Sequence, residues 1–288
     1  MDLLQNFLFV PADSSRKMAS ARSLHPDALI YDLEDAVSLA KKAEARHLLA
    51  GELANSGGTS AKIFIRVNSF DSEFFEEDLR ASVRPGVFGV ILPKCHDVAA
   101  VSELHQRLQR LENQIGMPEG TIKIVPILET AKGVARASEL ARSSSRIIAL
   151  FFGGEDFCAD MGIVRTKTGD EISFARSHVA LSAKAERLAA IDGPFTDFHD
   201  DAGLFEETRR VRQMGFTAKA LIHPNQIDTV HRAFAPSGDE IAFAEEVVKE
   251  FEKSGEGVAV VRGKMIDAPV VAQARTVLQR SNRTSNSR

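Results

Sequence analysis

The segment Lys123-Ile124-Val125-Pro126-Ile127-Leu128-Glu129 decides the fold of this 288-residue chain, because an apolar run with the length of a strand ends on a carboxylate. A second apolar run, over residues 147–154, is followed by Glu155 and Asp156. Two successive parallel strands would bring Glu129 and Asp156 to one edge of a sheet. Two carboxylates there suit a Mg²⁺ ion that also binds water and substrate oxygens.

Short β-rich runs alternate with longer amphipathic runs along the chain, which is typical of βα units in a parallel sheet. The seventh run is short and poor in β-branched residues. Eight parallel strands close a (β/α)₈ barrel, so we predict a TIM barrel over residues 1–235. The predicted strands cover residues 7–11, 28–34, 61–68, 87–93, 122–129, 147–154, 189–193 and 218–223.

Residues 236–288 have no place in a minimal barrel. They begin with a helical run over 238–254, continue through segment 257–269, and end in a polar tail, 281–288, that we expect to be frayed. Such a C-terminal extension either caps the barrel or reaches a neighbouring subunit, and we predict the second.

Composition sets limits on the partners and the location of the protein. The net charge of −4 provides no basic field for nucleic acid or for a membrane surface. Cys95 and Cys158 have no metal-type spacing, and isolated thiols fit a reducing compartment. The first residues show no basic region and no long apolar stretch, so we expect a cytoplasmic protein.

In a (β/α)₈ barrel the carboxyl ends of the strands form the active face. Arg66 ends the third predicted strand with a guanidinium that can hold a carboxylate by two parallel hydrogen bonds. Arg66 and Lys94 do not balance the acids at this face, so a divalent cation is inferred. The acids that fall there are Asp13, Asp32, Glu34, Asp35, Glu129, Glu155, Asp156 and Asp192, with His223 beside them.

Each of these residues also has a simpler interpretation. Glu129 alone fits an ion pair as well as a metal, and Asp156, after two glycines, fits a helix cap. Asp32 and Glu34 lie two residues apart on one strand, which favours orientation of Arg66, Lys94 or metal-bound waters over direct metal binding. His223 fits a structural histidine near a turn. The mixed charges of residues 41–46 indicate a solvated helix face.

Eight segments in order resemble the citrate lyase β-subunit-like family, within the HpcH/HpaI aldolase/citrate lyase superfamily. The likeness runs from about residue 6 to residue 279. Ala12 replaces a usual glycine, and Thr217-Ala218-Lys219 replaces a Gly-Lys pair, which leaves the cofactor side open. Asp35 stands where simple aldolases of the superfamily carry histidine, which favours the thioester branch. The segments are Leu8-Phe9-Val10-Pro11-Ala12-Asp13, Asp32-Leu33-Glu34-Asp35-Ala36-Val37, Ile65-Arg66-Val67-Asn68, Leu92-Pro93-Lys94, Pro126-Ile127-Leu128-Glu129-Thr130-Ala131, Gly154-Glu155-Asp156-Phe157, Ile222-His223-Pro224-Asn225-Gln226 and Gly263-Lys264-Met265-Ile266-Asp267-Ala268-Pro269.

The resemblance implies a Mg²⁺-binding barrel, usually a homotrimer or a dimer of trimers, that acts on 3-hydroxy-3-carboxyalkyl thioesters of coenzyme A. It implies that Asp267 is contributed to a neighbour's active site as a general acid/base. The remaining roles are Glu129 and Asp156 as metal ligands, Arg66 and Glu34 as catalytic residues, Arg66, Gly154, Glu155, Asp32 and Lys94 as substrate-binding residues, and Arg16 and Pro224 as CoA-binding residues.

The expected reaction is a reversible retro-Claisen cleavage of a malyl- or citramalyl-CoA-type thioester to a 2-oxo acid and an acyl-CoA. Three alternatives stay open: the β-subunit of a citrate lyase complex that acts on an acyl carrier protein, a malyl-CoA thioesterase, and a non-catalytic CoA-binding barrel.

Overall fold

The computed structural model describes residues 4–55, 59–255 and 257–286. The chain forms two compact units, residues 1–230 and residues 231–288. They divide inside helix α10 (Gln226–Phe234), five residues before the expected domain boundary. Among the described helices, none combines the length and the apolar character that a bilayer-crossing segment needs.

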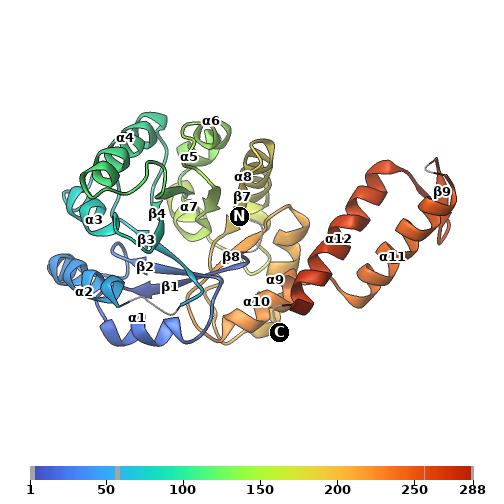
Figure 1. The fold of residues 1–288 in the computed structure, drawn as a ribbon, viewed down its shortest axis with the longest axis horizontal. Coiled ribbons are helices and arrows are strands. Elements are labelled where there is room, and N and C mark those ends of the chain that lie inside the picture. Colours follow the sequence, from blue (N-terminus) through green and yellow to red (C-terminus); the bar gives the residue numbers. More distant parts are fainter. Residues whose placement is uncertain (1–3, 56–58, 256, 287–288) are drawn as a thin grey trace. The chain divides into compact units, whose positions relative to one another are not determined.

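The first unit is a closed barrel of eight parallel strands in sequence order, with β8 paired back to β1 (Figure 1). The predicted (β/α)₈ fold and all eight predicted strands are therefore confirmed. The strands are β1 (Asn6–Pro11), β2 (Ala28–Asp32), β3 (Lys62–Arg66), β4 (Val87–Leu92), β5 (Lys123–Leu128), β6 (Ala149–Phe152), β7 (Ala189–Asp192) and β8 (Ala218–Leu221).

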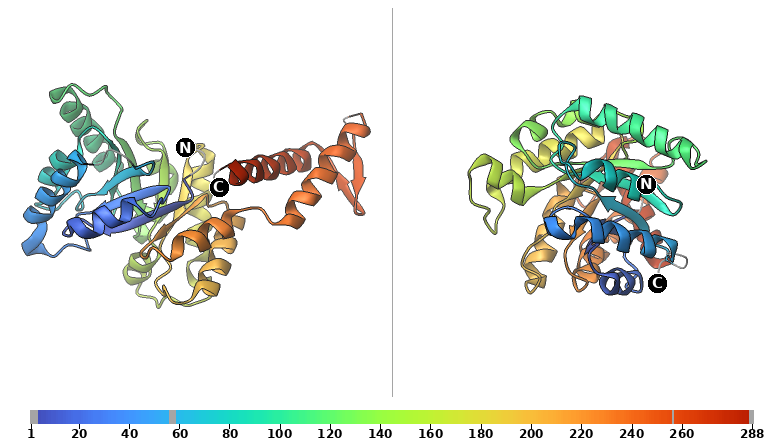
Figure 2. Two further views of the ribbon diagram at one scale, coloured as in Figure 1. Left: turned by 60° about the horizontal axis from the view of Figure 1, so that its bottom comes forward. Right: turned by 90° about the vertical axis from the view of Figure 1, so that its left-hand side faces the viewer.

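Helices surround this ring of strands, as the views in Figure 2 show. They are α1 (Ser15–Arg22), a 3₁₀ turn η1 (Leu39–Lys41), α2 (Lys42–Ala54), α3 (Phe75–Ser82), α4 (Val98–Gln114), α5 (Ala131–Ala135), α6 (Ala137–Ala141), α7 (Gly154–Met161), a second 3₁₀ turn η2 (Asp170–Ile172), α8 (Ser173–Ala185) and α9 (Asp201–Gln213).

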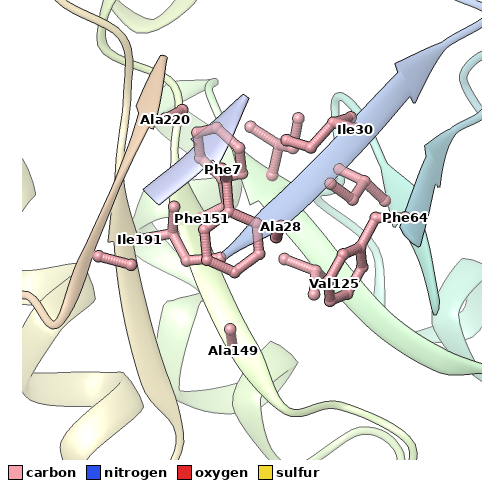
Figure 3. Close-up of a cluster of buried hydrophobic side chains, with 12 residues drawn as sticks. Phe7, Ala28, Ile30, Phe64, Val125, Ala149, Phe151, Ile191 and Ala220 are labelled. Atoms are coloured by element: carbon pink, nitrogen blue, oxygen red, sulfur yellow. The ribbon is translucent and has the colours of Figure 1, made fainter. Parts of the chain in front are cut away.

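Alternate residues of the strands fill the inside of the barrel (Figure 3). Phe7, Phe64 and Phe151 are the largest of these side chains, and Phe7 and Phe64 pack with their ring centroids 5.4 Å apart. Alanines face them from other strands, so that large and small side chains interlock, as is usual in filled barrels. The inward positions also include Ala28, Ile30, Ile91, Val125, Ile127, Ala149, Ile191, Ala218 and Ala220.

The same alternation carries beyond the apolar layer to the carboxyl ends of the strands. Because side chains alternate with a period of two, Asp32 follows Ile30 on the inner side and Arg66 follows Phe64. Glu129 likewise follows Ile127. The barrel core therefore directs these charged side chains toward one shared opening.

The outer side of β7 and β8 carries a buried cluster of charges. Asp192 alternates with the inward Ile191 and accepts hydrogen bonds from Arg176 Nε at 2.9 Å and Lys219 Nζ at 2.5 Å. Lys219 also donates to Glu207 of α9 at 2.9 Å. These contacts join the strands to α8 and α9. The prediction that Asp192 belongs to the active face is therefore wrong, because its strand position points it away from the barrel interior.

The second unit is a helical hairpin with a small two-stranded sheet. Helix α11 (Gly238–Lys253) begins with a capping box between Ser237 and Glu240 and packs along α12 (Ala268–Asn286). Strands β9 (Ala259–Val261) and β10 (Lys264–Ile266) are antiparallel. Helix α12 includes residues 281–286 of the tail that we expected to be frayed, and residues 287–288 lie outside the described residues.

A bidentate ion pair lies at the amino ends of β5 and β6. Arg146 donates from Nη1 and Nη2 to the two carboxylate oxygens of Glu112 at 2.8 and 2.6 Å, and both side chains are almost fully buried. Glu112 also accepts the backbone N–H groups of Gly120 and Ile122. Burial opposes ionisation of Glu112, but these hydrogen bonds keep its pKa below the usual range.

We predict that Arg146→Ala lowers the free energy of unfolding by about 3–5 kcal/mol, because it leaves the buried Glu112 carboxylate without its partner. Urea unfolding followed by circular dichroism measures the change. Arg110→Ala on helix α4, which also carries Glu112, is the matched control, because Arg110 is 63% exposed and its pair with Glu103 should contribute little. Equal effects of the two substitutions would contradict the assignment of Arg146 as a structural anchor.

Candidate active site

Glu129 is a deeply buried acid at the carboxyl end of the barrel. Its side chain is 3% exposed, and Oε1 accepts the backbone N–H of Lys94 at 2.6 Å. Lys94 adopts a positive φ of 52°, an uncommon backbone state that aims this N–H at the carboxylate. Burial, followed by the negative charge of Asp156, raises the pKa of Glu129 to about 8.

Asp156 lies in the first turn of α7 and is exposed. Within the described residues its carboxylate makes no hydrogen bond or ion pair, so the interpretation of Asp156 as a helix cap is not supported. Gly153, not a polar side chain, precedes the helix. The first N–H groups of α7, starting at Gly154, therefore remain available to an anion.

Gly153 makes room for the Glu129 carboxylate. A Cβ atom at position 153 would lie 2.6 Å from Glu129 Cβ and 2.7 Å from its Oε2. Since φ of Gly153 is −95°, steric contact and not backbone strain requires glycine here. The turn between β6 and α7 thus packs directly on one of the predicted metal ligands.

The carboxylates of Glu129 and Asp156 suit a hard cation whose other coordination positions stay open to water or substrate. Among the described residues no three His, Cys, Asp or Glu side chains gather into a complete metal centre. Glu129 and Asp156 supply two carboxylates whose mutual repulsion shows in the raised pKa of Glu129. Mg²⁺ is commonly held by one or two carboxylates while water and substrate oxygens complete its octahedron. The residues present fit this ion.

Arg66 is held by Asp32 on the neighbouring strand. Asp32 and Arg66 are register partners, and Nε and Nη2 of Arg66 donate to the two oxygens of Asp32 at 2.8 and 2.6 Å. Phe9 covers the guanidinium, with its ring centroid 4.8 Å from Cζ. Burial alone would lower the pKa of Arg66, but Asp32 and then Glu34 raise it above its ordinary value. Asp32 thus already occupies one edge of the Arg66 guanidinium, which was predicted to hold a substrate carboxylate.

Glu34 bridges Arg66 and Lys94. Its Oε2 lies 2.9 Å from Arg66 Nη1, and its Oε1 accepts from Lys94 Nζ at 3.1 Å. The Oε2 contact lacks hydrogen-bond geometry, so this buried oxygen has no hydrogen-bond partner within the described chain. Burial raises the pKa of Glu34, which the charge of Arg66 partly offsets. Asp32 and Glu34 therefore contact the two cations, as the hypothesis of an orienting role expects.

A buried lysine lies behind these acids. Lys42, the first residue of α2, is 4% exposed, so the prediction of a fully solvated face over residues 41–46 is wrong at this position. Its Nζ donates to the carbonyl oxygens of Leu33 and Glu34 at 2.7 and 2.8 Å and to Asn68 Oδ1 at 2.8 Å. The sequence reasoning missed Lys42, because a charged helix start gives no sign of burial.

A cavity of about 640 Å³ opens beside Lys94. It lies between the loops that follow β3 and β4 and the start of α4, and its lining includes Phe70, His96 and Arg107. Lys94 is the residue that this cavity shares with the acid cluster. A ligand of moderate size thus has space next to the site.

Five other predicted residues belong to α1, to α7, to the turn after β8 or to the second unit. Arg16 is exposed on α1, and Pro224 is exposed in the turn after β8. Their roles toward CoA stay predictions. Asp267 belongs to the second unit, where its Oδ1 accepts the N–H of Val270 at 3.4 Å at the start of α12. Glu155 is exposed, and its Oε1 lies 3.5 Å from Arg165 Nε. His223 stacks on Phe198 with ring centroids 5.0 Å apart.

The barrel and its acidic opening define a metal-assisted enzyme class, and comparison with known proteins places the chain within one family. The family model described as HpcH/HpaI aldolase/citrate lyase matches residues 5–224, so the chain belongs to this family. Its members named below are carbon–carbon lyases.

Three relatives illustrate the similarity. Citrate lyase subunit beta of Leuconostoc mesenteroides subsp. cremoris is 35% identical over 97% of this chain and 94% of its own length. Human mitochondrial citramalyl-CoA lyase is 33% identical over 94% of this chain and 83% of its own length. The crystal structure of CitE from Mycobacterium tuberculosis in complex with magnesium, acetoacetate and coenzyme A is 31% identical, with a TM-score of 0.82 over 96% of this chain and 98% of CitE.

We predict that Gly153→Ala destabilises the protein by about 1–3 kcal/mol, because the added methyl group overlaps the Glu129 side chain. Gly51→Ala is the control: it lies within helix α2 and meets nothing within 4 Å, so it should leave stability unchanged or raise it by about 0.5–1 kcal/mol. The melting temperatures of both variants, measured by thermal unfolding, test this prediction. A wild-type melting temperature for Gly153→Ala would contradict the tight packing.

Proposed function

We propose that the protein is a Mg²⁺-dependent carbon–carbon lyase that cleaves a malyl- or citramalyl-type thioester of coenzyme A to a 2-oxo acid and an acyl-CoA. The observation that carries this proposal is the pairing of two under-compensated carboxylates, Glu129 and Asp156, with an Arg66 guanidinium fixed at the same end of the barrel. The names of the similar proteins, which include citramalyl-CoA lyase and a magnesium complex of CitE, support it.

Glu129 and Asp156 would hold the Mg²⁺ ion. Bound there, the ion acts as a Lewis acid that acidifies the C3 hydroxyl and neutralises the substrate carboxylate. The N–H groups at the start of α7 provide a second contact for the same carboxylate. Gly154 and Glu155 are proposed to contribute these main-chain donors.

Arg66 presents a defined edge to the substrate. Since Asp32 occupies Nε and one N–H of Nη2, a carboxylate would take the outer N–H of Nη2 and Nη1, which now contacts Glu34 and donates to Asp35 Oδ2 at 3.5 Å. The substrate would replace the Glu34 contact on Nη1, which lacks hydrogen-bond geometry. The oxo-acid product would be held in the same way, so that charge on it is stabilised as the carbon–carbon bond breaks.

Proton transfers complete the reaction. The C3 hydroxyl gives its proton to a base, for which we propose Glu34, and its oxygen becomes the carbonyl of the oxo acid. The electron pair of the broken bond passes to the thioester as an enolate, whose carbon then accepts a proton. Lys94, bonded to Glu34 and 46% exposed at its side chain, would bind a substrate oxygen.

Asp267 is the proposed donor of that carbon-bound proton. We propose that it acts in a neighbouring subunit of a homotrimer or a dimer of trimers, with Arg16 and Pro224 on the CoA side.

The two buried free thiols, Cys95 and Cys158, support a cytoplasmic location.

A second candidate is the β-subunit role in a citrate lyase complex, with an acyl carrier protein as thioester carrier. The 35% identity to citrate lyase subunit beta over nearly the full length of both chains favours it. The chemistry at the barrel would be the same, and only the carrier and the partner subunits differ.

The first experiment supplies (3S)-malyl-CoA and (3S)-citramalyl-CoA to the purified protein, with Mg²⁺ or with EDTA, and measures glyoxylate and pyruvate. We expect metal-dependent release of one oxo acid. Release of free malate or citramalate with CoA would instead indicate a thioesterase. No product from either substrate would contradict the free-standing lyase and favour the subunit role or a non-catalytic barrel.

We predict that Glu129→Gln lowers kcat by about 100-fold or more, because a catalytic divalent ion contributes several kcal/mol to the barrier. Calorimetric titration with Mg²⁺ should show weakened binding in the same variant. Glu139→Gln, at an exposed acid of α6 that pairs with Arg136, is the matched control and should retain wild-type kcat. Full activity of Glu129→Gln in EDTA would exclude the metal role.

We predict that Asp267→Asn is inactive alone but regains activity when unfolded and refolded together with Glu129→Gln. A mixed oligomer contains sites in which both residues are intact if Asp267 acts in a neighbouring subunit. The regained activity should depend on the mixing ratio. Mixtures that stay inactive, despite mixed oligomers verified by native mass spectrometry, would place Asp267 within its own subunit's site or outside it.

A further inference from the structure

Lys42 occupies a position that helix stability does not explain. It is the first residue of α2, where the positive end of the helix dipole disfavours a cation. Its side chain is 4% exposed, and burial lowers its pKa against the opposing charges of Asp78, Asp32 and Glu34. A buried ammonium at the wrong end of a helix suggests that its contacts serve another part of the molecule.

The three donors of the Lys42 ammonium are all used. Two go to consecutive carbonyl oxygens, those of Leu33 and Glu34, at 2.7 and 2.8 Å. The third goes to Asn68 Oδ1 at 2.8 Å, and Asn68 Nδ2 donates to the carbonyl of Leu33 at 3.0 Å. Lys42 and Asn68 therefore hold the two peptide groups that flank Glu34.

The opposite side of this segment is held by Asp32. Its Oδ1 accepts the N–H of Glu34 at 2.8 Å, and its Oδ2 accepts the N–H of Ala36 at 3.1 Å. Asp32 of the barrel thus fixes the N–H groups of residues 34 and 36, and Lys42 of α2 fixes the carbonyls of residues 33 and 34. The direction of the Glu34 side chain, which contacts Arg66 and Lys94, depends on both.

We propose that Lys42 is a positioning residue of the active site: through the carbonyls of Leu33 and Glu34 it sets the place of the Glu34 carboxylate between Arg66 Nη1 and Lys94 Nζ. The effect of Lys42 on kcat rests on the lyase function proposed above. Its effect on the position of the Glu34 carboxylate does not.

Removal of the ammonium takes one donor from each of the Leu33 and Glu34 carbonyls, which keep Asn68 Nδ2 and the Val37 N–H, and it removes the donor to the buried Asn68 Oδ1. The segment is then expected to shift, and a displacement of about 1 Å in a catalytic group can lower turnover about 100-fold. Lys42→Met should therefore lower kcat by about 100-fold. Arg22→Met is the matched control, because Arg22 Nε also contacts α2, at Glu52 and 2.8 Å, but at the far end of the helix. It should keep wild-type kcat.

A double-mutant cycle with Glu34→Gln separates positioning from general loss of structure. If Lys42 acts through Glu34, Lys42→Met should change kcat by less than about 3-fold in the Glu34→Gln background. Thermal unfolding checks that each variant is folded. Lys42→Gln replaces Lys42→Met if the latter does not fold. Independent effects that multiply in the double variant would overturn the proposal.

A crystal structure of the Lys42 variant gives a readout that needs no turnover. We expect the Glu34 carboxylate to leave Arg66 Nη1 or Lys94 Nζ, with β2 and β3 still paired. Glu34 contacts that match the wild type would overturn the proposal, whether or not the wild-type protein cleaves a thioester. An inactive wild type with a displaced Glu34 in the variant would reject the lyase function and retain the positioning role.

Discussion

The bidentate ion pair between Asp32 and Arg66 is the interaction on which the candidate site depends. The two residues are register partners on β2 and β3, so closure of the barrel brings their side chains together at its carboxyl end. The pair fixes the guanidinium, and the same Asp32 carboxylate orders the turn that bears Glu34. A one-residue shift in the pairing register of β2 would turn Asp32 to the outside of the barrel and break all of these contacts.

Buried charges are compensated to different degrees at the two ends of the barrel. At the amino end, Glu112 and Arg146 form a closed pair in which each carboxylate oxygen has a cation and a backbone donor. At the carboxyl end, burial and like charge raise the pKa of Glu129, and one oxygen of Glu34 lacks a hydrogen bond. Balanced charge at one end fits a structural role, and unbalanced charge at the other fits the proposed site for a cation and an anionic substrate.

Strand residues of the candidate site could be predicted from the sequence, and so could Asp156 at the start of α7, but Lys42 of α2 could not. Glu129, Asp32 and Arg66 continue the two-residue alternation of apolar strands, so their inward direction follows from pattern alone. Asp192 ends a strand too, but it has the opposite parity, which would have excluded it had the inward positions of β7 been assigned first. Lys42 gave no signal, because its burial results from the packing of α2 against the loop after β2.

This difference has a physical origin in how each element meets the core. A strand of a closed barrel has two faces and a register fixed by its neighbours, so one apolar residue determines the direction of the next polar one. A helix on the outside can rotate and slide, and its polar residues reach the site only through loops whose course the sequence pattern leaves open. Inward side chains at the carboxyl ends of the strands can therefore be found from strand alternation. Those that hold them in place, such as Lys42 and the main-chain N–H of Lys94, require the folded structure.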